Sequence, residues 1–424
     1  MRIEKVKLKD VGPFKDLDLD LDLGPAPRGA EVVILTGPNG CGKSTILYAL
    51  ADLLAPPNHG QDLVARRMRS ASAFTAIDQG ARVVRRNHPS LGQGADFDPW
   101  TGIPLGGGFR DGERLIRHGY TTTPVEVEAF AYAGGRSIEP YQVDTIREPE
   151  GPMVGALSFE PAMGQRLADW VASTRAKEAL ASTSGDQAAA DRYRVALRAI
   201  EDVLSEVTSR PTKLEVSHQP LDVRLKWGGQ SIPLDLLPEG LKSILCWVAD
   251  LLLRLGRLRP ESSAPFLTRR FVLLLDEVEV HLHPAWQRQV LPLVQRLFTN
   301  AQVIVSTHSP FVVSSCPGAK VVCLQVDEQD GTASLRQIHT VGQGESYAAV
   351  LESVFGFDKP FDPETQRQLE SFYALRDKVL RGQRPLAELK ALAQPLLGLG
   401  VEVRDIVALE LRQAERRAAA SSAP

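Results

Sequence analysis

Short runs of alternating apolar and polar residues open the chain, and they predict strands. Residues 17–23 alternate strictly, residues 3–9 nearly so, and a continuous apolar run follows at residues 32–35. Alternation is typical of a strand with one buried face, whereas a continuous apolar run indicates a strand buried on both faces. We therefore expect two antiparallel strands, then a central strand, and then a helix over residues 46–54.

Helical spacing of the apolar positions dominates the middle and the end of the chain. It covers residues 165–207, where a polar break separates two expected helices, and most of residues 345–417. The other expected elements are a hairpin at residues 214–225, an apolar helix at 244–255, and strands at 125–132, 271–275, 302–306 and 320–326. Strands interleaved with helices predict an α/β fold.

Composition is that of a soluble globular protein and excludes several classes. The hydrophobic fraction of 43% is ordinary, and the net charge of −3 gives no overall signal for nucleic-acid binding. The four cysteines form no CxxC pair, which argues against a zinc site or a disulfide framework. The N-terminus is unlike a signal peptide, and no apolar run is long enough to span a bilayer. We therefore expect a cytoplasmic protein with no membrane contact.

Candidate chemistry is concentrated in the turn after the central strand, GPNGCGKST at residues 37–45. A buried strand, a glycine-rich turn and a helix N-terminus in this order form a phosphate-binding loop. Lys43 would reach the β- and γ-phosphates, and the Ser44 hydroxyl would bind Mg²⁺. The expected cofactors are therefore ATP and Mg²⁺. The residues of this loop that we expect to bind the nucleotide are Asn39, Gly40, Gly42, Lys43, Ser44 and Thr45.

A second apolar run, residues 271–275, ends in two carboxylates. Asp276 would hold the Mg²⁺ shell, and Glu277 would orient or deprotonate the attacking water. A carboxylate pair after a buried strand lies where open α/β sheets bind ligands. His308 comes just past another buried strand and would sense the γ-phosphate. The expected catalytic residues are thus Lys43, Glu277 and His308.

Three features have both a functional and a structural interpretation. Phe14 either lies against the adenine or packs as a turn aromatic. The segment 61–123, rich in arginine and glycine, is either a mobile arm that contacts a phosphate backbone or a partner, or a solvated insertion. His281 and His283 are spaced like metal ligands, but no cysteine or carboxylate set completes a tetrahedral site.

The motifs resemble those of an ABC-type ATPase head, and the heads of SMC, RecF and OLD proteins most closely. The resemblance rests on GPNGCGKST, LLLDE at residues 273–277 and STHS at residues 306–309. HLHPAWQ at residues 281–287 is typical of a bacterial AAA-family group that includes PtuA, the ATPase of Septu anti-phage systems, and ATPases of some retron systems. The implied fold is an α/β P-loop head with a mixed sheet, an antiparallel β flap, a helical lobe and a C-terminal helical extension.

This resemblance also implies a division of the chain into four regions. Residues 1–160 would be the first half of the head, with the phosphate loop and the arginine-rich insertion. Residues 161–260 would form the helical lobe and the signature segment, and residues 261–340 the second half of the head. Residues 341–424 would be a helical region for oligomerisation or partner binding.

In heads of this kind the ATP lies between two protomers, and the resemblance implies the same composite site here. The second protomer supplies a signature segment, which aligns with Leu237–Ser243 in this chain. Pro238 replaces the serine that would contact the γ-phosphate, whereas Gly240 keeps a backbone N–H at a helix N-terminus. We therefore expect a homodimer or larger assembly that hydrolyses ATP slowly.

A nuclease domain such as that of OLD proteins is not expected. Asp327, Glu328 and Asp330 follow a strand but form a turn-like cluster, and the rest of the chain is helical. The first hypothesis is therefore an ATPase that controls a partner nuclease, of the HNH type in the resembling systems, in phage defence. DNA would be reached through that complex. The alternatives are a RecF-like, ATP-gated DNA-binding repair protein and a nucleotide-locked scaffold without turnover.

Overall fold

The computed structural model describes residues 2–24, 29–55, 63–80, 82–88, 97–101, 109–111, 114–118, 128–147, 150–159, 164–258, 266–357 and 359–421. It has two compact units, residues 1–355 and residues 356–424. Among the described helices, none is both long enough and apolar enough for a membrane crossing.

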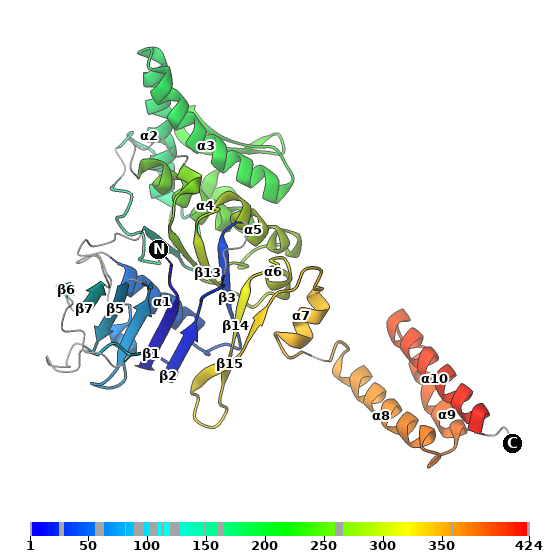
Figure 1. The fold of residues 1–424 in the computed structure, drawn as a ribbon. Helices are drawn as coiled ribbons and strands as arrows, with labels where there is room; N and C mark the ends of the chain where they lie inside the picture. Colours follow the sequence, from blue (N-terminus) through cyan, green and yellow to red (C-terminus); the bar gives the residue numbers. More distant parts are fainter. Residues whose placement is uncertain are drawn as a thin grey trace. The chain divides into compact units, whose positions relative to one another are not determined.

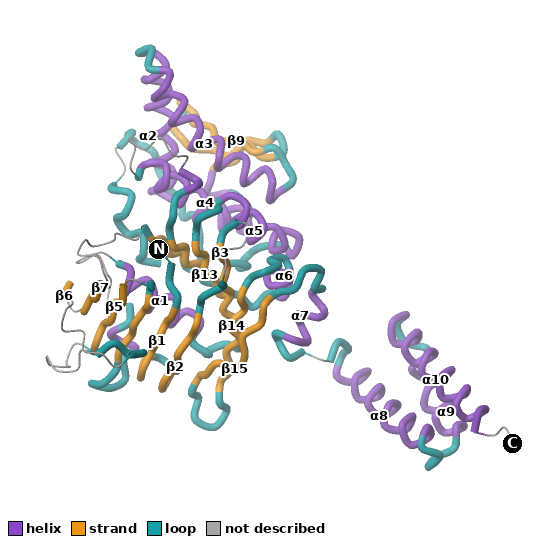
Figure 2. The backbone as a smooth tube through the Cα atoms, in the orientation of Figure 1, coloured by secondary structure: helices purple, strands orange, loops and turns teal. Residues whose placement is uncertain are grey.

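A mixed sheet of twelve strands in the described part of the chain is the centre of the larger unit (Figures 1 and 2). In spatial order the strands are β6 (Phe109–Asp111), β7 (Arg114–His118), β5 (Arg82–Asn87), β4 (Phe74–Asp78), β1 (Lys5–Val11), β2 (Phe14–Asp20), β15 (Ala333–Thr340), β14 (Lys320–Val326), β3 (Glu31–Thr36), β13 (Gln302–Ser306), β12 (Val272–Leu275) and β8 (Ala129–Tyr132). The run from β14 to β8 is parallel, and the run from β6 to β2 is antiparallel. The expected mixed sheet and antiparallel flap are confirmed.

Alternate side chains of the parallel strands enter two separate cores, as the pleat requires. Val33 and Leu35 of β3 pack with helix α1 (Lys43–Leu54), and Val32 and Ile34 pack on the opposite face. The helices that contribute to the second face are α2 (Gly164–Thr183), α3 (Gln187–Thr208), α4 (Glu239–Arg257), α5 (Pro284–Leu297), α6 (Pro310–Ser314) and α7 (Tyr347–Ser353). Because both faces are covered, the carboxyl edge of the parallel strands is left for a ligand.

Helices α2 and α3 form the expected helical lobe with a small antiparallel sheet (Figure 1). That sheet has the order β11 (Gln230–Pro233), β10 (Leu221–Trp227) and β9 (Thr212–His218). The predicted hairpin is therefore confirmed and gains a third strand. Trp170 of α2 is 2% exposed, so it belongs to the core, as expected from its helical spacing.

The second unit consists of three helices around their own small core. They are α8 (Pro363–Leu380), α9 (Leu386–Leu397) and α10 (Val401–Ser421). Leu369, Phe372, Leu389 and Val407 are buried among them. Asp362 begins α8 by accepting hydrogen bonds from the N–H groups of Glu364 and Thr365, a standard N-cap.

Two expectations differ from the structure. The second flap strand is residues 14–20 and not 17–23, because its ladder with β1 starts at the turn, with Phe14 opposite Val11. Strand β15 was not expected, since Ala333 is its only buried residue and it offers no apolar alternation. Within the segment 61–123, strands β4 and β5 extend the sheet and bury four consecutive residues, 74–77, so this part belongs to the nucleotide domain. Of the expected strand 125–132, residues 125–127 lie outside the described residues.

Candidate nucleotide site

The glycine-rich turn after β3 has a backbone that only glycine tolerates. Gly37, Gly40 and Gly42 have φ angles of 146°, 81° and 91°, values in the left-handed region that disfavour side chains. A Cβ at Gly37 would stand 2.5 Å from the carbonyl oxygen of Leu324. A Cβ at Gly42 would overlap the ring of Phe14, which is fully buried. Phe14 therefore supports the turn as a packed aromatic, which is the structural interpretation given above.

Helix α1 begins directly after this turn and presents a free N-terminus. Its N-cap is Gly42, which makes no side-chain capping bond, and the first turn of α1 carries no acidic residue. The N–H groups at such an end attract an anion, and the helix dipole adds positive potential. Asn39 and Gly40 are exposed at the tip of the turn, whereas Lys43 and Thr45 are buried and Ser44 is half-buried. The residues present therefore fit a polyphosphate.

Lys43 lies across the turn. Its Nζ donates to the carbonyl oxygens of Gly37 at 3.0 Å and Pro38 at 3.1 Å, and lies 3.7 Å from Cys41 Sγ. A phosphate oxygen is a stronger, charged acceptor for the same ammonium. The lysine is thus held inside the loop at the place where a phosphate would accept its hydrogen bonds.

The two carboxylates follow β12 at the same edge of the sheet. In the parallel register Leu275 is opposite Val305, and Ser306 is opposite Leu35 at the end of β3. The Ser306 hydroxyl donates to Asp276 Oδ1 at 2.5 Å and accepts the Glu277 N–H at 2.8 Å. The phosphate loop and the carboxylate pair, about 230 residues apart in sequence, therefore meet at one edge, as open α/β sheets require.

Glu277 has an unusual backbone and a tightly bounded side chain. Its φ angle is 43°, which costs a non-glycine residue on the order of 1 kcal/mol. A Cβ at Gly134 would be only 2.8 Å from the Glu277 Cβ and from its Oε2. Strained residues of this kind cluster at functional sites, and here the glycine leaves room for the carboxylate.

His308 joins the same group after β13. Its N–H donates to Glu279 Oε1 at 2.5 Å. Partial burial of the ring, followed by the charge of Lys43, lowers the pKa of His308, and the carboxylates of Glu279, Glu277 and Asp276 oppose that shift. Burial raises the pKa of the Tyr48 hydroxyl in α1, and the negative charges of Asp276 and Glu277 raise it further. The expected residues Lys43, Asp276, Glu277 and His308 are thus electrostatic neighbours.

Gly240, the expected nucleotide ligand from a second protomer, is packed against other residues within its own chain. It is buried in the first turn of α4, where an added Cβ would be 2.8 Å from the His281 carbonyl oxygen and 3.1 Å from the Trp286 ring. Its neighbours Pro238 and Glu239 are exposed. The start of α4 therefore rests on the turn that follows Glu277 and presents its tip outward.

The two histidines with metal-like spacing have other partners or surroundings. His283 caps helix α5, with its Nδ1 accepting the Ala285 N–H at 3.2 Å. His281 is exposed, with a φ angle of 64°. Asp330 pairs with Lys15 at 2.7 Å in the turn between β14 and β15, so the acidic cluster at 327–330 is the turn that its sequence predicts.

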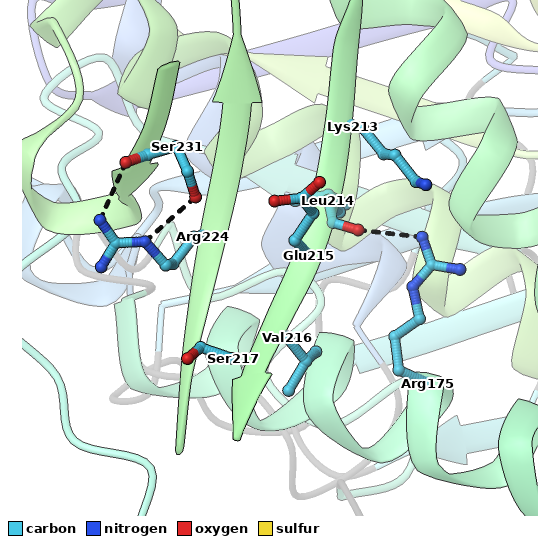
Figure 3. Close-up of a pocket in the computed structure, with 8 residues that line it drawn as sticks. All are labelled: Arg175, Lys213, Leu214, Glu215, Val216, Ser217, Arg224 and Ser231. Atoms are coloured by element: carbon cyan, nitrogen blue, oxygen red, sulfur yellow. Dashed lines mark hydrogen bonds between the residues drawn. The ribbon is translucent and has the colours of Figure 1, made fainter. Parts of the chain in front are cut away.

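A separate cavity of about 590 Å³ lies on the helical lobe (Figure 3). Arg175 of α2 donates to the carbonyl oxygen of Leu214 at 2.9 Å, and Arg224 donates to the backbone and hydroxyl oxygens of Ser231 at 2.8 and 3.1 Å. These arginines are thus bonded to the lobe itself. No expected site residue lines this cavity, so it is distinct from the nucleotide site.

Ser306, Gly134 and Arg136 all border the carboxylate pair, and no sequence pattern assigns a role to them. Arg136 is 1% exposed and donates to the backbone oxygens of Asp276 and Glu277. Gly134 and Arg136 follow strand β8 in the run GGR. The sequence signal for a site here is a glycine pair and an arginine directly after a buried strand. It is weak because the neighbouring strand β12 lies 140 residues further along the chain.

Comparison with known proteins agrees with this geometry. Residues 5–83 match the family model "AAA domain", and residues 176–314 match "AAA domain, putative AbiEii toxin, Type IV TA system". The chain is 22% identical to the Septu protein PtuA of Bacillus thuringiensis, over 94% of this chain and 99% of that protein. It is 36% identical to the Retron Ec83 probable ATPase of Escherichia coli over 27% of this chain, which spans about a fifth (21%) of that relative.

Among solved structures, the Smc head bound to the C-winged helix domain of ScpA aligns with a TM-score of 0.47 at 15% identity, over 81% of this chain and 100% of that one. The matches to both AAA models and to the retron probable ATPase agree with the loop, the carboxylate pair and the mixed sheet described above. The chain therefore carries AAA-domain sequence at residues 5–83 and 176–314, and it is similar to Septu PtuA over nearly its whole length.

Proposed function

We propose that this protein is the Mg²⁺-dependent ATPase subunit of an anti-phage defence complex, in which it controls a partner nuclease. The observation that supports it most is the convergence of Lys43, Asp276, Glu277 and His308 at one sheet edge. The similarity to Septu PtuA extends over 94% of the chain, so it includes the nucleotide motifs and the regions around them.

Each residue of the site has a chemical task in this proposal. Ser44 and Asp276 would hold Mg²⁺, which when bound neutralises phosphate charge. Lys43 binds the β- and γ-phosphates, and Glu277 accepts a proton from the attacking water. The water oxygen bonds to the γ-phosphorus, the bond to the β–γ bridging oxygen breaks, and ADP and phosphate leave. His308 donates a hydrogen bond to the γ-phosphate.

The proposed assembly completes this site with a second copy of the chain. The exposed tip at Pro238 and Glu239 begins a helix whose N-terminus has no side-chain cap, and the acidic Glu239 in its first turn is paired with Lys242 at 2.8 Å. Uncapped N–H groups at a helix end suit an anion. Gly240 would offer its N–H there across the interface. Pro238 provides no hydroxyl for the γ-phosphate, so we expect slow turnover, well below about 10 per second.

The C-terminal unit is the proposed surface for oligomerisation or for the nuclease. It has its own core, so it is a compact unit by itself. Val401, Leu409 and Leu399 are 63%, 52% and 42% exposed. Deletion of residues 356–424 should leave ATP binding intact and abolish co-purification of a nuclease encoded beside this protein. Loss of ATP binding together with the partner would contradict the separation of the two tasks.

The substitution Glu277→Gln tests the hydrolytic switch. It should retain ATP binding, lower turnover by about 100-fold or more, and trap the complex or abolish its control of the partner. Unchanged control of the partner would instead support a scaffold that needs only bound nucleotide. Tight duplex binding by this chain alone, weakened by roughly a decade or more over a severalfold increase in salt, would favour the RecF-like alternative.

A further inference from the structure

Arg136 is a buried cation next to the nucleotide site that none of the nucleotide motifs includes. Its Nη1 donates to the carbonyl oxygens of Ala133 at 2.7 Å and Asp276 at 3.1 Å. Its Nη2 donates to the carbonyl oxygen of Glu277 at 3.3 Å and lies 3.5 Å from Ser243 Oγ. A guanidinium that is 1% exposed requires such partners, because an unpaired buried charge is costly.

The electrostatics of Arg136 agree with this placement. Burial lowers the pKa of Arg136 to about 10, and the nearby thiol of Cys246 and the carboxylates of Asp276, Glu279 and Glu277 oppose the shift. The side chain therefore remains a cation at neutral pH. It faces three carboxylates of the site but forms its hydrogen bonds with the backbone that carries two of them.

Both backbone groups of Glu277, its N–H and its carbonyl oxygen, form hydrogen bonds that hold the strained φ angle. Its N–H donates to Ser306 Oγ at 2.8 Å, and its carbonyl oxygen accepts from Arg136 at 3.3 Å. Gly134, two residues before Arg136, makes room for the side chain of Glu277. A left-handed non-glycine residue persists only when its surroundings enforce it. These contacts contribute to that here, together with the N–H of Val280, which donates to the same carbonyl oxygen at 3.1 Å.

The same guanidinium reaches helix α4. Ser243 is in the second turn of that helix and is 1% exposed. Gly240, one turn earlier, packs on the carbonyl oxygen of His281 in the turn after Glu277. The start of α4 and the Asp276–Glu277 backbone are thus joined twice, through Arg136 and through the packing of Gly240.

We propose that Arg136 is a positioning residue: it fixes the backbone of Asp276 and Glu277 for hydrolysis and ties it to the start of α4. A nucleotide contact at the exposed tip of α4 would thereby move Glu277 in the same protomer. The second statement rests on the proposed function, since it requires that α4 meets the nucleotide of a second copy.

The substitutions Arg136→Met and Arg136→Lys test the proposal in the full-length protein. Arg136→Met should lower kcat by about 10- to 100-fold, which corresponds to about 1.4 to 2.8 kcal/mol, and should leave the ATP Kd within about threefold. Arg136→Lys should restore part of kcat, because an ammonium can reach one carbonyl oxygen but lacks the fork that reaches several. In a Glu277→Gln background, Arg136→Met should cause a smaller loss of kcat than it does in the wild type, since part of its effect passes through Glu277.

Arg254 provides a matched control. It is also 1% exposed and donates to two carbonyl oxygens, those of Pro152 and Val154, at 2.7 and 2.9 Å, but it pairs with Asp250 within α4. Arg254→Met removes a comparable buried cation outside the nucleotide site. It should lower the melting temperature to a similar extent while kcat stays within about threefold of the wild type.

Hydrogen exchange of the nucleotide-free protein tests the positioning role of Arg136 independently of the proposed ATPase activity. Arg136→Met should accelerate exchange at residues 276–280 and 239–243, and Arg254→Met should not, whether or not the wild type hydrolyses ATP. If Arg136→Met does not fold, Arg136→Lys carries the same comparison. Wild-type kcat and exchange in a folded Arg136 variant would overturn the proposal, as would a parallel loss of ATP affinity.

Discussion

The hydroxyl of Ser306 donates a 2.5 Å hydrogen bond to the carboxylate of Asp276. The two residues are at the ends of neighbouring parallel strands, so the bond fixes the orientation of the carboxylate relative to the sheet. The same hydroxyl oxygen accepts the N–H of Glu277 at 2.8 Å. One serine thus orients the proposed metal ligand and the residue proposed to accept the proton of the attacking water.

Ser306→Ala should therefore impair hydrolysis more than nucleotide binding. The substitution leaves the buried carboxylate oxygen of Asp276 and the half-buried N–H of Glu277 without their partner, which costs about 1–3 kcal/mol of stability. We expect kcat to fall about tenfold and the ATP Kd to change less than about threefold. Ser315→Ala is the control, since that hydroxyl donates to the carbonyl oxygen of Val312 at the end of α6. Equal losses in both variants would contradict a specific role for Ser306.

Lys43→Met should abolish ATP binding without unfolding the protein. Among the described residues the ammonium bonds only to its own loop, through the carbonyl oxygens of Gly37 and Pro38 and the thiol of Cys41, so the fold loses little. A wild-type protein with Mg-ATP at about 100 times its Kd should gain about 2.7 kcal/mol, visible as a higher melting temperature. The variant should show no shift. A normal shift would mean that the nucleotide binds elsewhere.

The nucleotide motifs could be predicted because their chemistry is local in sequence. The turn at residues 37–45 needs glycine at fixed positions, and its φ angles bear this out at Gly37, Gly40 and Gly42. The strands before Asp276 and His308 are short apolar runs whose burial follows directly from composition. Parallel packing of such strands then brings their carboxyl ends together, whatever the length of chain between them.

The contacts that complete the site are made between residues distant in sequence, so no local sequence pattern predicts them. Arg136 bonds to residues 140 positions later, and its side chain is of a type that is usually exposed. Strand β15 could not be predicted for the same reason: it is mostly polar and forms by pairing with β14. Phe14 shows the reverse case, since packing of an apolar aromatic beside a glycine turn could be expected from the sequence, and its ring lies against Gly42.

His308 should give the turnover rate a defined pH dependence. Partial burial and the charge of Lys43 lower the pKa of His308 from its ordinary value of 6.5, so the ring is neutral at about pH 7 and gains a proton only below pH 6.5. If the neutral ring is the active form, turnover should stay level above about pH 7 and fall only as the pH drops below 6.5. His308→Gln should lower kcat about tenfold and remove that fall, which a pH–rate profile of both proteins would measure. An unchanged profile in the variant would assign the fall to another group.

Gly240→Ala tests whether the start of α4 needs its close packing on the turn after Glu277. An alanine Cβ would stand 2.8 Å from the His281 carbonyl oxygen and 3.1 Å from the Trp286 ring, which are backbone and a large aromatic that cannot easily move. We expect a loss of about 1–3 kcal/mol in the free energy of unfolding, as for overpacking elsewhere, and a lower kcat because the turn is displaced.

Gly256→Ala, in the same helix, is the matched control. Of the residues that the structure describes, its added Cβ would meet only the Cβ of Ala196 at 3.6 Å, an ordinary contact. Helix propensity should therefore make the substitution neutral or stabilising by up to about 1 kcal/mol. Chemical denaturation of both variants separates crowding at Gly240 from a general effect of alanine in α4. If Gly240→Ala were as stable and as active as Gly256→Ala, α4 would not be rigidly joined to the carboxylate loop, and a contact at its tip would have no direct path to Glu277.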